Sequence, residues 1–367
     1  MAIIHIVSRM RVGIVGGGII GYAAAFELAR RGADVTVFDM RDPGAGATLA
    51  SAGMLAPYIE GHDNEALLAL TVRGLDVYDD FVNEVRRVAD IEFEYRRSGS
   101  IEVAGSEDRA RLLLSRVTPL LQARVVEWLD AVQVGAREPA LRTNQCGGLL
   151  CRLHGYVTVG PFMAALVRAC ERTGVAFRFG RVDDICFDDE ECRVKTADGR
   201  SAVDRIVLST GSWASLLDPL NEIRGAIRPI RGQLLVLSWP AAPLQHIVWG
   251  QSCYIVPWRD GTLLVGATSE DVGFDERATV HGVTALLAAA GELLQDLGKA
   301  SFLEVRVGLR PASASGMPFM GPSAEDPRLV YATGHFRNGV LLAPLTARLI
   351  AGYLLDGQTD PAFENGA

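Results

Sequence analysis

The 367-residue chain lacks several patterns that would narrow its function immediately. Its six cysteines include no Cys-x-x-Cys pair, which argues against a zinc site or a disulfide framework and is typical of a protein in a reducing cytosol. It has no Gly-x-Ser-x-Gly nucleophile segment and no His-x-x-x-His spacing, so neither a serine hydrolase nor a bound metal is predicted. The net charge of −8 argues against nonspecific nucleic-acid binding.

Long apolar runs without polar interruption are also scarce. The first ten residues, "MAIIHIVSRM", are partly apolar but lead directly into a predicted strand, so no secretory signal is expected. We take it as a hypothesis that Met10 is the native start and that residues 1–9 are an extension. Residues 240–258 carry no formal charge, but their prolines and glutamines are typical of a loop and a strand. The sequence therefore predicts a cytoplasmic protein without a membrane partner.

The clearest positive signal is "RVGIVGGGIIGYAAAFELARRGADVTVFD" near the N-terminus. A short apolar strand precedes a Gly-x-Gly-x-x-Gly turn at Gly16, Gly18 and Gly21, and a helical segment follows. A second strand then ends at Asp39. Such glycines allow a tight turn, close approach to a pyrophosphate and close helix–strand packing, while the helix N-terminus attracts phosphate. An acid at the end of the second strand accepts hydrogen bonds from a ribose diol, which favours FAD or NAD over NADP.

Two later segments bear on the choice between FAD and NAD. The loop "GAGATLASAGMLAP" (44–57) is rich in small residues and indicates a backbone that passes close to a flat group, although a flexible surface loop has the same composition. The segment "DRIVLSTGSWAS" (204–215) has the apolar run of a buried strand and a tight end. We expect this strand to return to the nucleotide domain after an excursion of the chain.

At this point the sequence resembles the D-amino-acid-oxidase-type family of FAD-dependent oxidoreductases, and within it the glycine oxidases of the thiamine pathway. The resemblance covers nearly the whole chain and rests on six blocks in the order of the family. They are "GIVGGGIIG", "SAGMLAP", "PIRGQLLVL", "CYIVPWRDGTLLVGATSEDVGFDE", "GLRPASASGMPFMGP" and "YATGHFRNGVLLAP".

The resemblance implies an α/β fold with a Rossmann-like FAD-binding domain of the glutathione-reductase type and an interleaved α+β substrate domain on an antiparallel sheet. We expect the FAD-binding domain to comprise residues 10–85, 150–222 and 309–367. The substrate domain is then formed by residues 86–149 and 223–308. Helical periodicity in 64–88, 107–121 and 282–298, and strand patterns in 231–239, 253–258 and 261–268, agree with this division.

The resemblance also implies site residues. Arg310 is expected to hold the substrate carboxylate, since a planar guanidinium forms two parallel hydrogen bonds, and Arg337 to point into the same pocket. Tyr254 and Ser269 are expected to bound the pocket; Ser269 replaces a larger apolar side chain and would widen it. From the residues alone, Arg310 and Arg337 could equally be structural or surface arginines, and Tyr254 a core aromatic. The expected FAD contacts are Gly16, Gly18, Ile19, Ile20, Gly21, Asp39, Met40, Ala47, Thr48, Ala52, Gly53, Met54, Val182, Thr210, Gly211, His335, Phe336, Arg337, Asn338, Gly339, Val340 and Leu341.

The implied activity is oxidative deamination of glycine or an N-substituted glycine by hydride transfer to flavin. The imine product hydrolyses to glyoxylate and an amine, and O₂ is reduced to H₂O₂. No acid or base is required, because orientation and charge stabilisation carry the step. No cysteine follows Cys253, so FAD is expected to be non-covalent.

Several alternatives remain open. They are removal of a carboxymethyl group from a larger N-carboxymethyl amino acid, D-amino-acid oxidation, a dehydrogenase linked to an electron carrier, and a non-catalytic FAD-binding subunit. The partners expected are a small amine and O₂, with a homo-oligomer as a further hypothesis. The physiological amine, the pathway and the oligomeric state are not determined by the sequence.

Overall fold

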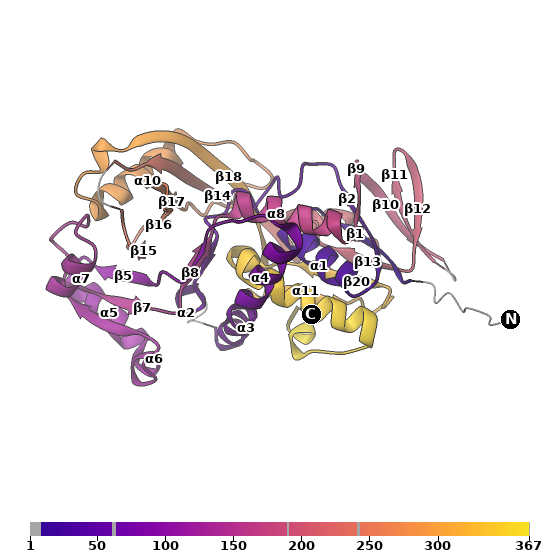
Figure 1. Ribbon diagram of the computed structural model, residues 1–367, viewed down its shortest axis with the longest axis horizontal. Coiled ribbons are helices and arrows are strands. Elements are labelled where there is room, and N and C mark those ends of the chain that lie inside the picture. Colours follow the sequence, from indigo (N-terminus) through magenta and orange to yellow (C-terminus); the bar gives the residue numbers. More distant parts are fainter. Residues whose placement is uncertain (1–8, 61–63, 189–190, 241–242, 367) are drawn as a thin grey trace.

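The computed structural model describes residues 9–60, 64–188, 191–240 and 243–366 of the chain. Two large sheets lie toward opposite ends of an elongated molecule (Figure 1). The hypothesis that residues 1–9 are an extension falls almost entirely outside the described residues. Within them, the mixture of parallel and antiparallel sheets confirms the predicted α/β fold class.

The first large sheet has six strands in the order β19-β20-β13-β1-β2-β9. Their bounds are β1 Arg11–Val15, β2 Asp34–Asp39, β9 Ala176–Phe179, β13 Arg205–Leu208, β19 Phe319–Pro322 and β20 Leu329–Thr333. All neighbours are parallel except β19 and β20. Ile14 of β1 lies opposite Val207 of β13, so the strand predicted to return from far along the chain does lie beside the first strand.

Helices α1 (Ile19–Arg30), α8 (Val159–Arg172) and α11 (Gly339–Asp356) cover this sheet, as Figure 1 shows. Helix α1 is buried along almost its whole length, from Tyr22 to Leu28, and packs with α11 and α8 in one apolar core. Its end agrees with the sequence: Gly32, just past the helix, has a φ of +99°, which few residues other than glycine adopt.

The second large sheet has eight strands in the order β18-β14-β17-β16-β15-β5-β7-β6. Their bounds are β5 Ser100–Ala104, β6 Glu127–Asp130, β7 Gly147–Cys151, β14 Ile227–Ser238, β15 Ile247–Trp249, β16 Tyr254–Pro257, β17 Thr262–Gly266 and β18 Ser301–Ser313. The three predicted strands in 231–268 pair antiparallel, as expected. Helix α10 (Val280–Leu293) packs on this sheet and closes a second core.

The remaining elements connect the two sheets or extend their edges. The strands are β3 Met54–Leu55, β4 Tyr95–Arg96, β8 Gly155–Val157, β10 Val182–Phe187, β11 Cys192–Thr196 and β12 Gly199–Val203. The α-helices are α2 Pro57–Glu60, α3 Glu65–Asp76, α4 Tyr78–Ala89, α5 Glu107–Arg116, α6 Thr118–Gln122, α7 Ala131–Arg137 and α9 Ala214–Leu217. Short 3₁₀ turns are η1 Gly211–Trp213, η2 Leu297–Lys299, η3 Phe336–Asn338 and η4 Pro361–Gly366.

The division into two discontinuous domains stays a prediction. All strands of the six-stranded sheet come from the three predicted FAD-binding segments. The eight-stranded sheet comes mostly from the predicted substrate segments, but β7 and β18 cross the predicted boundaries at 149/150 and 308/309. Because β18 runs without interruption across its boundary, residues on one strand can reach both the nucleotide loops and the substrate sheet.

One helical stretch, Phe336–Asp356, is long and apolar enough to span a membrane by length and composition. Its apolar window is 72% buried inside the protein, against α1 and the six-stranded sheet. A core helix of an α/β domain has the same composition, since it is apolar on most sides.

Candidate active site

A single large cavity of about 830 Å³ runs between the two sheets, within the part of the chain that the structure describes. It is lined by the turn between β1 and α1, the end of β2 and the small-residue loop 44–54. The end of β13, the strands β16 to β18 and the segment 332–340 complete its wall. Segments distant in sequence thus form one continuous pocket.

The glycine turn at one end of the cavity has the geometry that the sequence predicted. Gly16 has a φ of +113°, and a Cβ there would lie 2.4 Å from the Ser209 carbonyl oxygen. A Cβ on Gly21 would lie only 1.9 Å from the Gly16 carbonyl oxygen. Gly18 is the N-cap of α1 and has a φ of −79°. The atom nearest to a Cβ on Gly18 would be the Thr48 hydroxyl oxygen, at 3.4 Å. Two of the glycines are therefore required by packing within the chain, and Gly18 is not.

Asp39 ends β2 and lines the cavity beside this turn. Its carboxylate accepts hydrogen bonds from the Gly17 amide at 2.6 Å and from the Arg41 amide at 2.8 Å. A carboxylate has about four lone-pair sites, so it retains acceptor capacity for ribose hydroxyls. The ribose contact itself stays a prediction.

The small-residue loop 44–54 passes close to the glycine turn and to β18. The Ile19 amide at the start of α1 donates to the Thr48 hydroxyl at 3.1 Å, and the Gly44 amide donates to the Gly17 carbonyl oxygen at 2.8 Å. A Cβ on Gly308 of β18 would lie 2.7 Å from the Ala50 side chain. The loop therefore joins the nucleotide turn to the strand that carries Arg310.

The cavity fits a dinucleotide. Its volume of about 830 Å³ lies within the usual range for cofactor pockets, roughly 300–1,000 Å³. The hydroxyl oxygen of Thr210, on its wall, is buried and has no hydrogen-bond partner among the described residues. A buried hydroxyl without a partner is costly, so an ordered ligand atom at this position would stabilise it.

Arg41 and Trp213 were not predicted from the sequence, yet both line the cavity. The Arg41 guanidinium lies 4.5 Å from the centroid of the Trp213 ring, and Trp213 packs against Phe274 from the loop after β17. The only sequence signal was a basic residue two positions after Asp39. No local sequence pattern predicts that Arg41 contacts the Trp213 ring or that Phe274 packs against it.

Arg310 and Tyr254, the residues expected to bind and to bound the substrate, both line this cavity; their roles stay predictions. Arg310 of β18 donates through Nη1 to the Thr268 carbonyl oxygen at 3.0 Å. A Cβ on Gly232 of the neighbouring β14 would lie 2.3 Å from the Arg310 guanidinium, so the absence of a side chain there makes room for it. A Cβ on Gly266 would lie 2.5 Å from the Tyr254 ring, so β17 makes room for the tyrosine in the same way.

Trp249 adds a further wall that the sequence did not indicate. Its ring packs against Tyr254 with centroids 5.1 Å apart. It lines the cavity, and its indole Nε1 is buried without a hydrogen-bond acceptor in the described part of the chain. A buried indole N–H usually has a hydrogen-bond acceptor, so that of Trp249 is an exception.

The segment Gly334–Gly339, which holds five of the expected FAD contacts, forms the turn η3 and the start of α11. His335 is fully enclosed and contacts the Thr346 hydroxyl through Nε2 at 3.0 Å; burial lowers the pKa of His335 to about 3, so its ring is neutral. Arg337 lines the cavity with its guanidinium 5.6 Å from the Phe336 ring centroid. The segment therefore contributes the neutral imidazole of His335 and the cationic side chain of Arg337 to the cavity wall.

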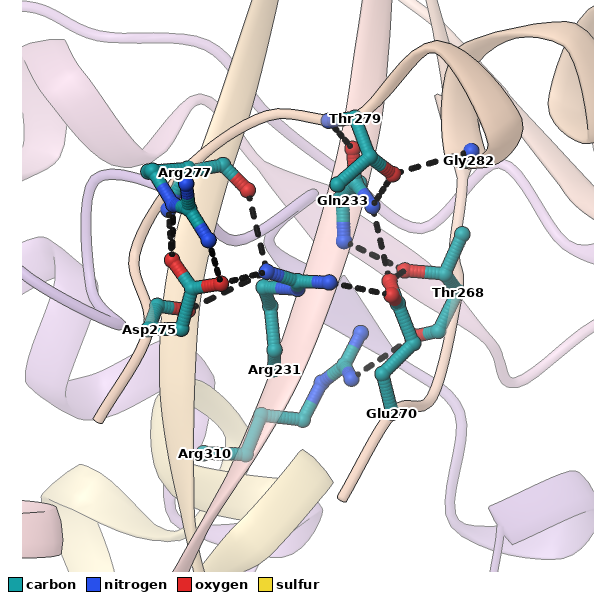
Figure 2. A network of polar contacts seen from close by, with 9 residues as sticks. All are labelled: Arg231, Gln233, Thr268, Glu270, Asp275, Arg277, Thr279, Gly282 and Arg310. Atoms are coloured by element: carbon teal, nitrogen blue, oxygen red, sulfur yellow. Dashed lines mark hydrogen bonds and ion pairs between the residues drawn. The ribbon is translucent and has the colours of Figure 1, made fainter. Parts of the chain in front are cut away.

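A network of polar side chains lies behind Arg310 (Figure 2). Arg231, which is 4% exposed, donates through Nη2 to Glu270 at 2.6 Å and forms an ion pair through Nη1 with Asp275 at 2.9 Å. Burial alone would raise the pKa of Glu270, but hydrogen bonds from Arg231, Thr268 and Gln233 outweigh it and lower the pKa to about 2. Glu270 is therefore a carboxylate at neutral pH.

Most of the predicted site residues come together in this cavity. Those that line it are Gly16, Gly18, Ile19, Ile20, Asp39, Met40, Ala47, Thr48, Ala52, Met54, Val182, Thr210, Gly211, Tyr254, Arg310, His335, Phe336, Arg337, Gly339 and Val340. Those that do not are Gly21, Gly53, Asn338, Leu341 and Ser269. Gly21 and Gly53 pack directly against backbone, whereas Ser269 is exposed. That Ser269 shapes the pocket stays a prediction, as do the individual FAD contacts.

Metal ligands do not gather anywhere in the described ranges: no group of three or more His, Cys, Asp and Glu side chains is close enough to hold an ion.

Comparison with known proteins gives consistent matches along the whole chain. The family model "FAD dependent oxidoreductase" matches residues 11–353. The glycine oxidase of Geobacillus kaustophilus is 33% identical over 347 residues, which cover 94% of this chain and 92% of that enzyme. The bifunctional protein ThiO/ThiG of Nostoc is 35% identical over 96% of this chain, which spans 54% of that longer protein.

Solved structures agree. The crystal structure of the G. kaustophilus glycine oxidase superposes with a TM-score of 0.90 at 32% identity and covers 96% of each chain. The iminodiacetate oxidase of Chelativorans superposes with a TM-score of 0.86 at 30% identity, again over 96% of each chain.

Proposed function

The chain belongs to the family of FAD-dependent oxidoreductases, and we propose that it oxidises glycine or an N-substituted glycine at the carbon next to the carboxylate. The imine product hydrolyses to glyoxylate and an amine, with O₂ as the final electron acceptor. The observation that carries the proposal is the position of Arg310, which lines the same cavity as the dinucleotide turn. The relatives support the substrate class, since two of them are named for glycine and iminodiacetate, both amines next to a carboxylate.

Bound FAD supplies the acceptor for the electron pair and the chemistry that reduces O₂. The residues of this chain bind and orient the substrate. Arg310 offers a planar cationic fork to the carboxylate, and its carbonyl contact with Thr268 limits the rotation of that fork. A substrate held in this way loses orientational freedom before the reaction, which lowers the barrier without any proton transfer from the protein.

The absence of an assigned acid or base agrees with the lining of the cavity. Among the described lining residues, the carboxylates are Asp39 and Asp183, and neither lies on the strands that carry Arg310 and Tyr254. The lining imidazole is that of His335, which burial keeps neutral and which contacts Thr346. The substrate amine reacts in its neutral form, because its nitrogen lone pair must form the imine as the hydride leaves.

A larger N-carboxymethyl amine is the second candidate substrate. The observation that favours it is the similarity to the iminodiacetate oxidase, because iminodiacetate is itself an N-carboxymethyl amine. The products would then be glyoxylate and the larger primary amine. A D-amino-acid oxidase and a carrier-linked dehydrogenase are less favoured, since the relatives compared above are named for glycine and iminodiacetate.

We further propose that FAD is held without a covalent bond and that the protein works in the cytoplasm. None of the six cysteines, all of which lie in the described ranges, forms a disulfide. Cys253, the last of them, is buried, and burial raises the pKa of its thiol to about 12, so it is a poor nucleophile.

The test is a panel of glycine, N-methylglycine, iminodiacetate and D-alanine, with H₂O₂ and glyoxylate measured together. We expect both products in equal amounts from at least one glycine derivative. Pyruvate and H₂O₂ from D-alanine at a higher kcat/KM would reassign the protein as a D-amino-acid oxidase. Reduction of the flavin without H₂O₂ would indicate a carrier-linked dehydrogenase.

A further inference from the structure

One contact that orients Arg310 is made with a backbone carbonyl group. Its Nη1 donates to the Thr268 carbonyl oxygen at 3.0 Å, while its guanidinium lies over Gly232 of β14. Thr268 lies two residues after the end of β17, at the start of the loop that leads to α10. Whatever holds the Thr268 peptide group in place therefore also holds one side of the Arg310 fork.

Thr268 is held by three hydrogen bonds of its own. Its amide donates to the Gln233 carbonyl oxygen at 3.2 Å, and its hydroxyl accepts from the Gln233 amide at 2.8 Å. The same hydroxyl donates to Oε1 of Glu270 at 2.6 Å. The first two bonds align Thr268 with β14, and the third ties its side chain to a carboxylate. A hydroxyl that both accepts and donates has little rotational freedom left.

Glu270 connects Thr268 to the rest of the polar network in Figure 2. Its two oxygens accept from Thr268, from the Gln233 side chain at 2.7 Å and from Arg231 at 2.6 Å. Its backbone pairs with that of Arg231 in both directions, at 2.8 and 2.9 Å. Successive side chains of a strand alternate between faces, so Arg231 and Gln233 share the face of β14 opposite Gly232. The network thus supports Arg310 from the other side of the strand.

We propose that Glu270 and the Thr268 hydroxyl are positioning residues for Arg310: they fix the Thr268 carbonyl oxygen that orients the guanidinium for the substrate carboxylate. This inference rests on the proposed function, in which Arg310 binds that carboxylate. Loss of the hydroxyl leaves the Glu270 oxygen and the Gln233 amide without their shared partner. The Thr268 peptide group then gains freedom, and the fork of Arg310 loses its fixed direction.

The network provides its own control on the far side of Arg231. Asp275 forms an ion pair with the same guanidinium through Nη1 and accepts three hydrogen bonds from Arg277, two from its guanidinium and one from its amide. Within the network of Figure 2, Asp275 contacts neither Thr268 nor Arg310. Asp275→Asn therefore alters the other carboxylate that pairs with Arg231 without removing a contact of Thr268 or Arg310.

The experiment measures carboxylate binding directly. Glycolate, which has the carboxylate of glycine but no amine, is titrated into the FAD-loaded protein, and its dissociation constant is read from the flavin absorbance. We expect Thr268→Val, which keeps the shape and removes the hydroxyl, to weaken glycolate binding on the order of tenfold. Thr268→Ser, which keeps the hydroxyl, should restore it. Glu270→Gln should weaken it, and Asp275→Asn should leave it within about twofold.

Kinetics and FAD affinity complete the test. For the positioning variants, KM for the best glycine derivative should rise more than kcat falls, and FAD should bind as in the wild-type protein. Equal losses in Glu270→Gln and Asp275→Asn, or unchanged glycolate binding in Thr268→Val, would overturn the inference while leaving the proposed function standing. Failure of the wild-type protein to bind glycolate would overturn the proposed function and the inference with it.

Discussion

Arg41 donates to both carboxylate oxygens of Glu276, at 3.0 and 2.9 Å, although the two residues are 235 positions apart in the sequence. The same guanidinium lies over the Trp213 ring, and the Phe274 ring packs against the same tryptophan. The loop between β17 and α10 is thereby attached to the wall of the dinucleotide cavity. This loop also contains Glu270 and Asp275, so one segment reaches both ends of the site.

The first prediction follows from this attachment. Arg41→Ala removes the ion pair and the ring contact together, each of which contributes up to about 1 kcal/mol. We expect the dissociation constant for FAD to rise about five- to thirtyfold, as measured by fluorescence titration of the apoprotein. Glu276→Gln keeps the ring contact and should show a smaller rise. An FAD affinity unchanged in Arg41→Ala would mean that the attachment does not reach the cofactor.

The second prediction concerns Arg310. Arg310→Ala should lower kcat/KM by tens- to thousands-fold, because a lost charge-assisted bidentate contact costs on the order of 2–5 kcal/mol. Arg310→Lys should recover little, since an ammonium lacks the planar fork. Arg306→Ala is the matched control, because Arg306 lies on the same strand but pairs with Glu304. Near-normal kinetics in Arg310→Ala would assign the carboxylate to another group.

The third prediction separates two glycines of the dinucleotide turn. Gly21→Ala places a Cβ against the Gly16 carbonyl oxygen, so the apoprotein itself should lose stability. Gly18→Ala meets nothing closer than the Thr48 hydroxyl, so it should leave the apoprotein stable but weaken FAD binding. Thermal unfolding without FAD, followed by FAD titration, distinguishes the two. Equal melting temperatures for both variants would contradict the packing argument.

The fourth prediction is that acid precipitation releases the flavin. The buried Cys253 is the last cysteine of the chain, and its raised thiol pKa disfavours attachment. The supernatant should contain all of the FAD, with the mass of the polypeptide unchanged. A yellow pellet with a mass increase equal to that of FAD would show a covalent bond to some other residue.

The fifth prediction concerns pH. The pKa of Glu270 falls from an ordinary 4.5 to about 2 in the folded protein, so the folded state favours its charged form. The stability from this group is fully present above the unfolded value and is lost as pH falls from about 4.5 to about 2. The urea midpoint of the wild-type protein should therefore fall more steeply than that of Glu270→Gln between pH 5 and pH 3. If the urea midpoints of the two proteins fall equally between pH 5 and pH 3, Glu270 adds nothing to stability in acid.

Much of the fold could be predicted because its signals are local. The first strand, the glycine turn, helix α1 and the second strand were read from apolar patterns and glycine spacing, and all four are present. Boundaries were less predictable. The helical stretch 64–88 divides into α3 and α4 at Val77, and the stretch 107–121 divides at Val117, two residues before Pro119. A single period of apolar residues continues across such breaks, so the pattern does not reveal them.

The sequence by itself determined the dinucleotide turn, since the positive φ of Gly16 and the contact of Gly21 with the Gly16 carbonyl oxygen belong to one short βα unit. It also determined which residues had the chemistry to hold a carboxylate, Arg310 among them. Only the tertiary structure decided that Thr268, Glu270 and Arg231 support Arg310, and that Arg41 meets Glu276. These contacts depend on the register of β14 against β18 and on the path of the loop after β17. A charged side chain carries no periodic signal for its partner, so only the folded chain selects one among the many carboxylates.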